Sequence, residues 1–204
     1  MRPPPCVLED RRTEHFVGRR RVGHAVTVRW DDFRRQAPRL AAVAHERLIA
    51  PGVLLVVTIR RDGTPRLSPV EPLVLDGELW LSMMWQSRKA SDLLRDDRIL
   101  VHSITTTREG NEGEVKVRGH AIPVDDLGVR DRYRHEVAIL GWQPEEPNFH
   151  LFRVELTDVT LIRYGSAGDQ YVARWPSGAE FVRRATSPTS VGVEEPIVDL
   201  LQPE

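Results

Sequence analysis

The 204-residue chain has little cysteine, little lysine and no long apolar run. Its one cysteine, Cys6, cannot form an internal disulfide, which fits a reducing compartment. No segment approaches the roughly 18 apolar residues of a membrane helix, and no apolar run follows the charged N-terminus, so we expect neither a membrane span nor a secretory signal. The formal net charge of −1 gives no global attraction to nucleic acid or membranes. These absences favour a cytoplasmic globular protein.

One of only two lysines, Lys89, lies in the stretch Leu79–Arg98, which reads LWLSMMWQSRKASDLLRDDR. Apolar alternation in its first part predicts a strand, and apolar residues at helical spacing in its second part predict a helix. Ser87 occupies the N-cap position, where its hydroxyl accepts a free backbone N–H. Arg88 and Lys89 then lie at a helix end that already favours an anion. The pattern indicates a phosphate site; the alternative is a surface helix that starts with two basic residues.

Two Asp-Gly pairs separate the apolar segments that precede this stretch. Val53–Ile59 is apolar and β-branched, as in a buried strand. Asp62-Gly63 predicts a type I′ hairpin turn, and residues 66–75 return as a strand whose two prolines indicate a bulge or a sheet edge. Asp76-Gly77 predicts a second tight turn. Two such turns close together predict an antiparallel meander.

The rest of the chain adds more strands and few helices. Helices are predicted at residues 31–49, with a break at Pro38, after Ser87, and at 125–140. Further strands are predicted at residues 99–105, 115–124, 151–164, 170–175 and 180–184. Hairpin-connected strands with few helices favour a mainly β fold, an antiparallel barrel or sandwich.

We divide the chain into three parts. Residues 1–30 form a basic extension rich in proline and arginine, residues 31–184 form the β domain, and residues 185–204 form a C-terminal tail. A basic arm can touch nucleic acid. No aromatic interleaving or binding motif accompanies this one, so we expect it to lie on its own domain or on a partner chain, with no nucleic-acid partner.

From about Ala41 to Val124, and more weakly to Tyr164, the order of these features resembles the pyridoxamine 5′-phosphate oxidase-like family of flavin-binding split β-barrels. The features are a strand, an Asp-Gly turn, a strand carrying an arginine, a second Asp-Gly turn, and then Ser87-Arg88-Lys89-Ala90 and Asp97-Arg98. The resemblance implies an antiparallel split β-barrel of the FMN-binding type. It also implies a homodimer with FMN in the groove between the two chains.

The resemblance further implies which residues contact the cofactor. Arg66, Arg88 and Lys89 match the cations that hold the FMN phosphate, and a phosphomonoester is close to a dianion near neutral pH. Ser82 and Met83, on the third strand, match positions that contact the flavin, and Glu114 stands where the oxidases have a glutamine. The full set of expected cofactor-binding residues is Arg66, Leu67, Ser68, Ser82, Met83, Ser87, Arg88, Lys89 and Glu114.

The sequence also departs from the oxidases. Glu71-Pro72 stands where they have a lysine, and their C-terminal substrate-binding segment has no match. We therefore expect an FMN-dependent oxidoreductase with another small-molecule substrate, and no oxidation of pyridoxamine phosphate. A sister group binds deazaflavin, whose phosphate and glutamyl tail need cations such as Arg60 and Arg61, and another relative binds haem through histidine. The alternatives are thus a deazaflavin-dependent reductase and a non-catalytic flavin- or haem-binding protein.

The remaining polar residues indicate no further chemistry. None of the seven histidines forms a metal-ligand pair on one element, so we expect no metal site. His102 and His120, on predicted strands, are more simply core or surface residues than ligands. Trp85, just before the phosphate turn, is a candidate wall for a flavin ring, with core packing as the alternative. No catalytic side chain is identified.

Overall fold

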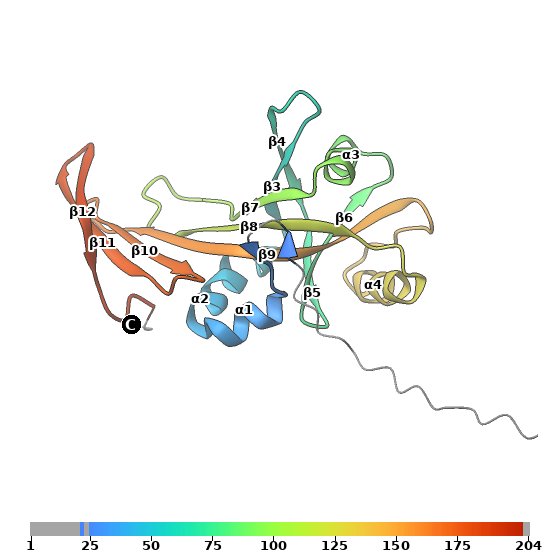
Figure 1. Ribbon diagram of the computed structural model, residues 1–204, viewed down its shortest axis with the longest axis horizontal. Helices are drawn as coiled ribbons and strands as arrows, with labels where there is room; N and C mark the ends of the chain where they lie inside the picture. The colour runs from blue at the N-terminus through green and yellow to red at the C-terminus, as the bar shows by residue number, and fades with distance from the viewer. Residues whose placement is uncertain (1–20, 23–24, 202–204) are drawn as a thin grey trace, which may run out of the picture.

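The computed structural model describes residues 21–22 and 25–201 (Figure 1). Cys6 and most of the predicted basic extension, including Arg19 and Arg20, lie outside the described residues. The helices are α1 (Trp30–Gln36), α2 (Pro38–Ala44), the π-helical turn η1 (His45–Ile49), α3 (Arg88–Arg95) and α4 (Leu127–Ile139). The strands are β1 (Arg21–Val22), β2 (Ala25–Val26), β3 (Leu54–Ile59), β4 (Pro65–Val70), β5 (Pro72–Leu75), β6 (Glu78–Met84), β7 (Arg98–His102), β8 (Glu114–Pro123), β9 (Phe149–Tyr164), β10 (Gln170–Trp175), β11 (Glu180–Ser187) and β12 (Ser190–Pro196).

The large sheet is antiparallel throughout and open, which confirms the predicted split β-barrel. Its strand order is β12-β11-β10-β9-β8-β7-β3-β4, while β6 pairs with β5 and with β9. The long strand β9 therefore joins the parts: its first half pairs with β6, and its second half lies between β8 and β10. In Figure 1, β9 crosses the length of the molecule, with α1, α2 and α4 on one side and α3 on the other.

Strand β6 is buried on both faces. Leu79, Leu81 and Met83 belong to the main core, as their alternation predicts. Trp80 and Ser82 face the opposite way, beneath helix α4, where a second apolar cluster lies. Burial on both sides fixes the register of β6, because a one-residue slip would exchange its two faces. The turn that follows β6 is thus held in a defined place.

The two Asp-Gly turns differ in conformation. Asp76 and Gly77 have φ of 53° and 75°, as a type I′ turn requires. The type I′ prediction for Asp62-Gly63 is wrong, because only Gly63 has a positive φ there. The Asp62 carboxylate accepts hydrogen bonds from Thr64 N and Oγ1 at 3.0 and 2.6 Å, and Arg60 N donates to Thr64 O at 2.8 Å. These bonds close a three-residue loop with glycine in the left-handed position.

The prediction of a C-terminal tail from residue 185 also needs correction. Strand β11 runs to Ser187, and β12 pairs with it antiparallel from Ser190 to Pro196. An edge strand of this kind is held by backbone hydrogen bonds, so it needs few large apolar side chains and leaves little trace in the hydrophobic pattern. The other predicted strands and helices are present with shifts of a few residues at their ends; the N-cap of α4, for example, is Asp126.

Strands β8 and β9 approach each other very closely at a bulge between Arg118 and Gly119. A Cβ atom on Gly119 would lie 2.0 Å from the carbonyl oxygen of Glu155. The bulge can therefore form only with glycine at this position.

A buried ionic cluster joins the start of α1 to strands β6 and β9. Arg29 Nε lies 2.8 Å from Glu78 Oε1, and Glu155 accepts from Thr27 Oγ1 and from Arg153 at 2.9 Å each. Glu78 is 7% exposed, and its Oε2 has no hydrogen-bond partner within residues 21–22 and 25–201. Burial raises the pKa of Glu78 to about 6, against the smaller opposing effects of Arg29 and Arg153.

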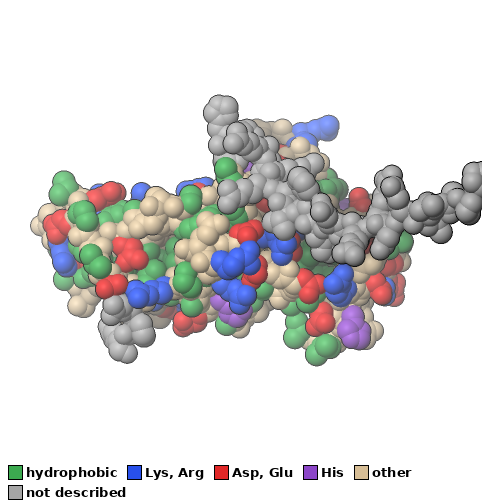
Figure 2. All heavy atoms as spheres, turned by 60° about the horizontal axis from the view of Figure 1, so that its bottom comes forward, with side chains coloured by type: hydrophobic (Ala, Val, Ile, Leu, Met, Phe, Trp, Pro, Cys, Tyr) green, Lys and Arg blue, Asp and Glu red, His purple; other side chains and the backbone are tan. Residues whose placement is uncertain are grey.

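Charges of both signs are interspersed with apolar side chains on the face shown in Figure 2. This mixture agrees with the formal net charge of −1. Within the described residues, no helix is long and apolar enough to cross a membrane.

Candidate functional site

Helix α3 begins at a turn whose backbone is set by Gln86 and Ser87. Gln86 has a φ of 56°, an uncommon value for a residue other than glycine. Ser87 is the N-cap, as predicted, and its Oγ accepts from Ala90 N at 3.4 Å. Ser91 Oγ donates to the Ser87 carbonyl oxygen at 3.1 Å, which fixes the turn further. The positive end of the helix dipole thus lies at a rigid turn, with Arg88 as the first helical residue.

A cavity of about 690 Å³ lies between α3 and the β3–β4 hairpin. Five arginines and two aspartates line it, which leaves an excess of three positive charges. The lining residues are Arg60, Arg61, Asp62, Arg66, Arg88, Ser91, Asp92 and Arg95. We call this space the arginine cavity. Clefts of this size and this charge attract anions.

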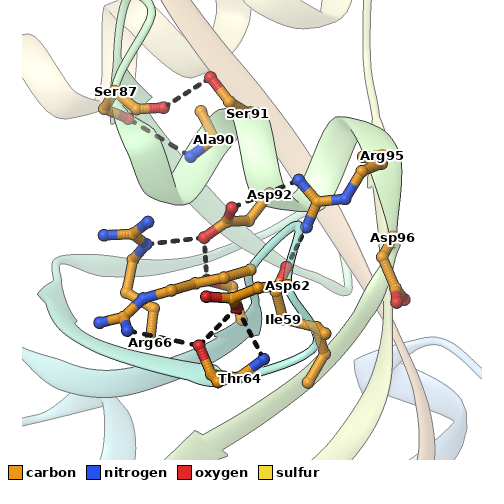
Figure 3. A network of polar contacts seen from close by, with 12 residues as sticks. Ile59, Asp62, Thr64, Arg66, Ser87, Ala90, Ser91, Asp92, Arg95 and Asp96 are labelled. Atoms are coloured by element: carbon orange, nitrogen blue, oxygen red, sulfur yellow. Dashed lines mark hydrogen bonds and ion pairs between the residues drawn. The ribbon is translucent and has the colours of Figure 1, made fainter.

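Asp92 is the centre of a polar network in the wall of the arginine cavity (Figure 3). Its Oδ2 accepts from Arg66 Nε at 2.7 Å and from Thr58 Oγ1 at 3.0 Å, and its Oδ1 lies 3.5 Å from Arg95 Nη1. Arg95 also donates to the carbonyl oxygen of Ile59. Burial on its own would raise the pKa of Asp92, but the hydrogen bonds from Arg66 and Thr58 outweigh it and lower the pKa. Asp92 is therefore an anion at neutral pH that holds two arginines.

The two predicted helix cations face different partners. Arg88 lines the arginine cavity and has no hydrogen bond or ion pair with any described residue. Lys89 does not line the cavity; its Nζ donates to the Pro69 carbonyl oxygen on β4 at 2.9 Å. Burial lowers the pKa of Lys89, while Glu71 opposes the effect. Arg66 and Arg88 thus share the cavity, and Lys89 ties α3 to the edge strand.

Of the other predicted cofactor residues, none lines the arginine cavity. Leu67 is 62% exposed on β4, and Ser68 is half-buried on the same strand. Ser82 is buried and accepts a hydrogen bond from Tyr133 Oη at 2.7 Å, and Met83 is part of the main core. Ser82 and Met83 thus take part in the packing of β6, and Leu67 is exposed to solvent.

Glu114 lies at the start of β8, in a separate polar group. It accepts from Lys116 Nζ at 2.6 Å and lies 3.3 Å from His102 Nε2. His120 Nδ1 is similarly 2.9 Å from Asp97 Oδ1. Both strand histidines thus have acidic partners. Within the described part of the chain, no group of three or more His, Cys, Asp or Glu side chains is placed to hold a metal ion.

Besides Asp62, which was predicted only as a turn residue, three lining residues of the cavity were not predicted as site residues from the sequence: Ser91, Asp92 and Arg95. They follow Arg88 at helical spacings of three, four and seven, so all four lie on one face of α3. This spacing was a usable signal. The contact of Asp92 with Arg66 could not be predicted from the sequence, because it depends on how the β3–β4 hairpin packs against α3.

A smaller cavity of about 300 Å³ lies beside α3, with Leu94, Phe152 and Trp85 among its lining residues. Trp85 is 48% exposed and stacks on His150, with ring centroids 4.7 Å apart and planes at 12°. Gln86 N donates to His150 Nε2 at 3.2 Å. Aromatic surface therefore lies within three residues of Arg88 in the chain.

The residues of the arginine cavity fit a phosphate group. Arg88, the capped helix N-terminus and the fixed Arg66 supply charge-assisted donors, which are the strongest partners of such an anion.

Comparison with known proteins agrees with this fold. The pyridoxamine 5′-phosphate oxidase family matches residues 40–163. No curated protein matches the chain. Among solved structures, a putative pyridoxamine 5′-phosphate oxidase from Listeria innocua has a TM-score of 0.51 at 13% identity, over 61% of this chain and 95% of that one.

Two further structures have a TM-score of 0.50. One is a Clostridium acetobutylicum protein related to general stress protein 26 (pyridoxinephosphate oxidase family), at 12% identity over 72% of this chain and 97% of that one. The other is PhzG from Burkholderia lata 383 in complex with tetrahydrophenazine-1-carboxylic acid, at 14% identity over 82% and 93%. At these identities the likeness concerns the fold.

Proposed function

The chain belongs to the pyridoxamine 5′-phosphate oxidase family, and from this premise we propose that it is an FMN-dependent oxidoreductase. The FMN phosphate would occupy the arginine cavity, held by Arg88 and Arg66. One observation carries the proposal. Arg88, which has no ion-pair partner in the part of the chain that the structure describes, lies at the capped N-terminus of α3, a position that disfavours a cation unless an anion is present.

When bound, the flavin would supply the redox chemistry at its own ring. The chain would contribute binding and orientation. Arg88 and the first-turn N–H groups of α3 would hold the phosphate together with Arg66 of β4. Arg88 on α3 and Arg66 on β4 would together set the direction in which the rest of the cofactor extends. The two elements keep their relative position because Lys89 Nζ donates to the Pro69 carbonyl oxygen.

A second cofactor, deazaflavin, is favoured by a separate observation. Arg60 and Arg61 line the same cavity near the tip of the β3–β4 hairpin, and they add positive charge beyond what a single phosphate needs. A glutamyl tail would supply further carboxylates. In that case Arg60→Ala and Arg61→Ala should weaken deazaflavin binding and leave FMN binding nearly unchanged in titration calorimetry.

The active form would be a homodimer. The sheet is open, and β4 lies at one end of its strand order. A second copy is the proposed cover for the arginine cavity beside this strand. Sedimentation of the cofactor-bound protein tests this, and a monomer at micromolar concentration contradicts it.

The test of function combines a spectrum with a titration. Oxidised flavin shows two visible bands, deazaflavin one band and haem a Soret peak, so the absorption of the purified protein separates the cofactors. Loss of one hydrogen bond to a charged group costs roughly 1.5–3 kcal/mol, so Arg88→Ala should weaken FMN binding about ten- to a hundredfold. Riboflavin, which lacks the phosphate, should be affected much less.

The matched control is Arg183→Ala on β11, where Arg183 Nε bonds the Gly192 carbonyl oxygen far from α3 in the chain. If the parent and Arg88→Ala bind FMN with equal affinity, the phosphate site at α3 is wrong, and α3 is a surface helix that starts with two basic residues. Turnover with NAD(P)H or reduced deazaflavin then separates an enzyme from a flavin- or haem-binding protein without catalysis.

A further inference from the structure

Arg66 donates to Asp92 from only one nitrogen of its guanidinium group, Nε. An arginine carries five N–H donors in a planar fork, and only the Nε donor goes to Asp92. The Nη1 and Nη2 groups have no hydrogen bond with any described residue, and Arg66 lines the arginine cavity. Nη1 and Nη2 of Arg66 can therefore still donate two parallel hydrogen bonds to a phosphate.

Asp92 itself cannot move with a ligand. Its residue is 5% exposed, and Thr58, which donates to the same oxygen as Arg66, has no exposed surface. On the other side Arg95 is bonded to both Asp92 and the backbone of β3 at Ile59 (Figure 3). The carboxylate is therefore a fixed point between α3 and β3.

We propose that Asp92 is a positioning residue of the anion site, which holds Arg66 by Nε so that its Nη edge is presented to the bound phosphate. A long flexible side chain loses rotamer freedom when it binds a ligand. Fixing the side chain beforehand removes that loss from the binding step and strengthens binding. The inference rests on the proposed function for the identity of the ligand, but its geometry concerns any phosphate in this cavity.

Charge alone predicts the opposite effect of Asp92. A carboxylate in an anion site repels the ligand, so its removal should tighten binding. Asp92 uses both carboxylate oxygens to accept from Arg66, Thr58 and Arg95, and an asparagine has only one acceptor oxygen for these three donors. Positioning therefore predicts that Asp92→Asn, which keeps the shape and removes the charge, weakens FMN binding by about tenfold, equivalent to ~1.4 kcal/mol. The sign of the change therefore distinguishes the two roles.

Asp62 provides a matched control in the same cavity. Its carboxylate lines the cavity but bonds only Thr64, and an asparagine can keep those contacts through its Oδ1. Asp62→Asn removes the same charge without freeing an arginine, so FMN should bind equally well or more tightly. Thr58→Val removes one bond to Asp92 and leaves its charge, so FMN binding should weaken by a smaller factor than in Asp92→Asn.

The experiment is titration calorimetry of the full chain with FMN, riboflavin and pyrophosphate, after urea denaturation has shown that each variant is folded. Asp92→Asn should weaken FMN and pyrophosphate and spare riboflavin, and in an Arg66→Ala background it should no longer weaken either ligand. Thr58→Val carries the test if Asp92→Asn does not fold. Parent-like or tighter FMN binding by Asp92→Asn overturns the proposal, as does an equal loss for riboflavin or a loss that persists without Arg66.

Pyrophosphate separates this inference from the proposed function. If the parent binds pyrophosphate but not FMN, the flavin assignment fails, and the effect of Asp92→Asn on pyrophosphate still decides the role of Asp92. If the parent binds neither, both are wrong.

Discussion

Glu78 makes stability depend on pH in a way that one substitution should remove. The side chain is 10% exposed, one carboxylate oxygen pairs with Arg29, and the other has no hydrogen-bond partner among the residues that the structure describes. Burial raises its pKa from 4.5 to about 6. The unfolded chain has the ordinary value, so the folded protein binds this proton more tightly than the unfolded chain does. The substitution Glu78→Gln keeps the shape and removes the titration.

The size and the sign follow from the same two pKa values. A difference of about 1.5 pKa units, at 1.36 kcal/mol per unit, is about 2 kcal/mol. This stabilisation is fully present below about pH 4.5 and is lost as the pH rises through about 6, where Glu78 ionises in the folded protein. Relative to the parent, Glu78→Gln should therefore gain about 2 kcal/mol in unfolding free energy between pH 4.5 and pH 7.5.

Urea denaturation of both proteins across this pH range measures the difference directly, because other titrating groups affect parent and variant alike. Glu109→Gln, at an exposed position of the loop before β8, is the control and should show no such trend. A difference between Glu78→Gln and the parent that stays constant with pH, or that falls as the pH rises, would refute the reasoning.

Two further predictions concern stability and binding. In Gly119→Ala the new Cβ would lie 2.0 Å from the carbonyl oxygen of Glu155, so the bulge must open. Urea denaturation should show a free energy of unfolding lower by about 1–3 kcal/mol or more, the usual cost of overpacking. Parent-like stability would contradict the close approach. Lys89→Ala removes the bond to the Pro69 carbonyl oxygen that ties α3 to β4. By calorimetry FMN binding should weaken, but by less than in Arg88→Ala, because Lys89 does not line the arginine cavity and can act only through the position of α3. Arg183→Ala should match the parent, and equal affinities of all three would exclude a role for Lys89.

The parts of the fold and site that the sequence predicts correctly are those with local causes. The cap at Ser87 and the turn at Asp76-Gly77 are set by one or two residues and their own backbone. The meander follows from such turns and from alternation within each strand. These signals suffice to place α3 directly after β6.

The parts that escape prediction depend on contacts between distant segments. In the sequence Asp92 looks like any other polar residue of a helix. Its role becomes visible only in the fold, where Thr58 and Arg66 of the β3–β4 hairpin donate hydrogen bonds to it. Lys89 could have faced the cavity, and it bonds β4 instead. Strand β12 forms through backbone pairing with β11, which side-chain periodicity does not report. Local signals thus locate the site, and tertiary packing decides which side chains complete it.

The pairing of β9 also sets an order of assembly. Strand β6, which leads into the turn at Ser87, is registered against residues far ahead in the chain: Leu79 lies opposite Val154, and Met84 opposite Phe149. A growing chain that has not reached β9 already contains every arginine of the cavity, but it lacks the partner that holds β6 in place. Pairings of this sequence separation form slowly, because a long loop must close first. The arginine cavity is therefore completed only after β9 has been synthesised, and a cofactor would bind a chain in which β6 is already paired with β9.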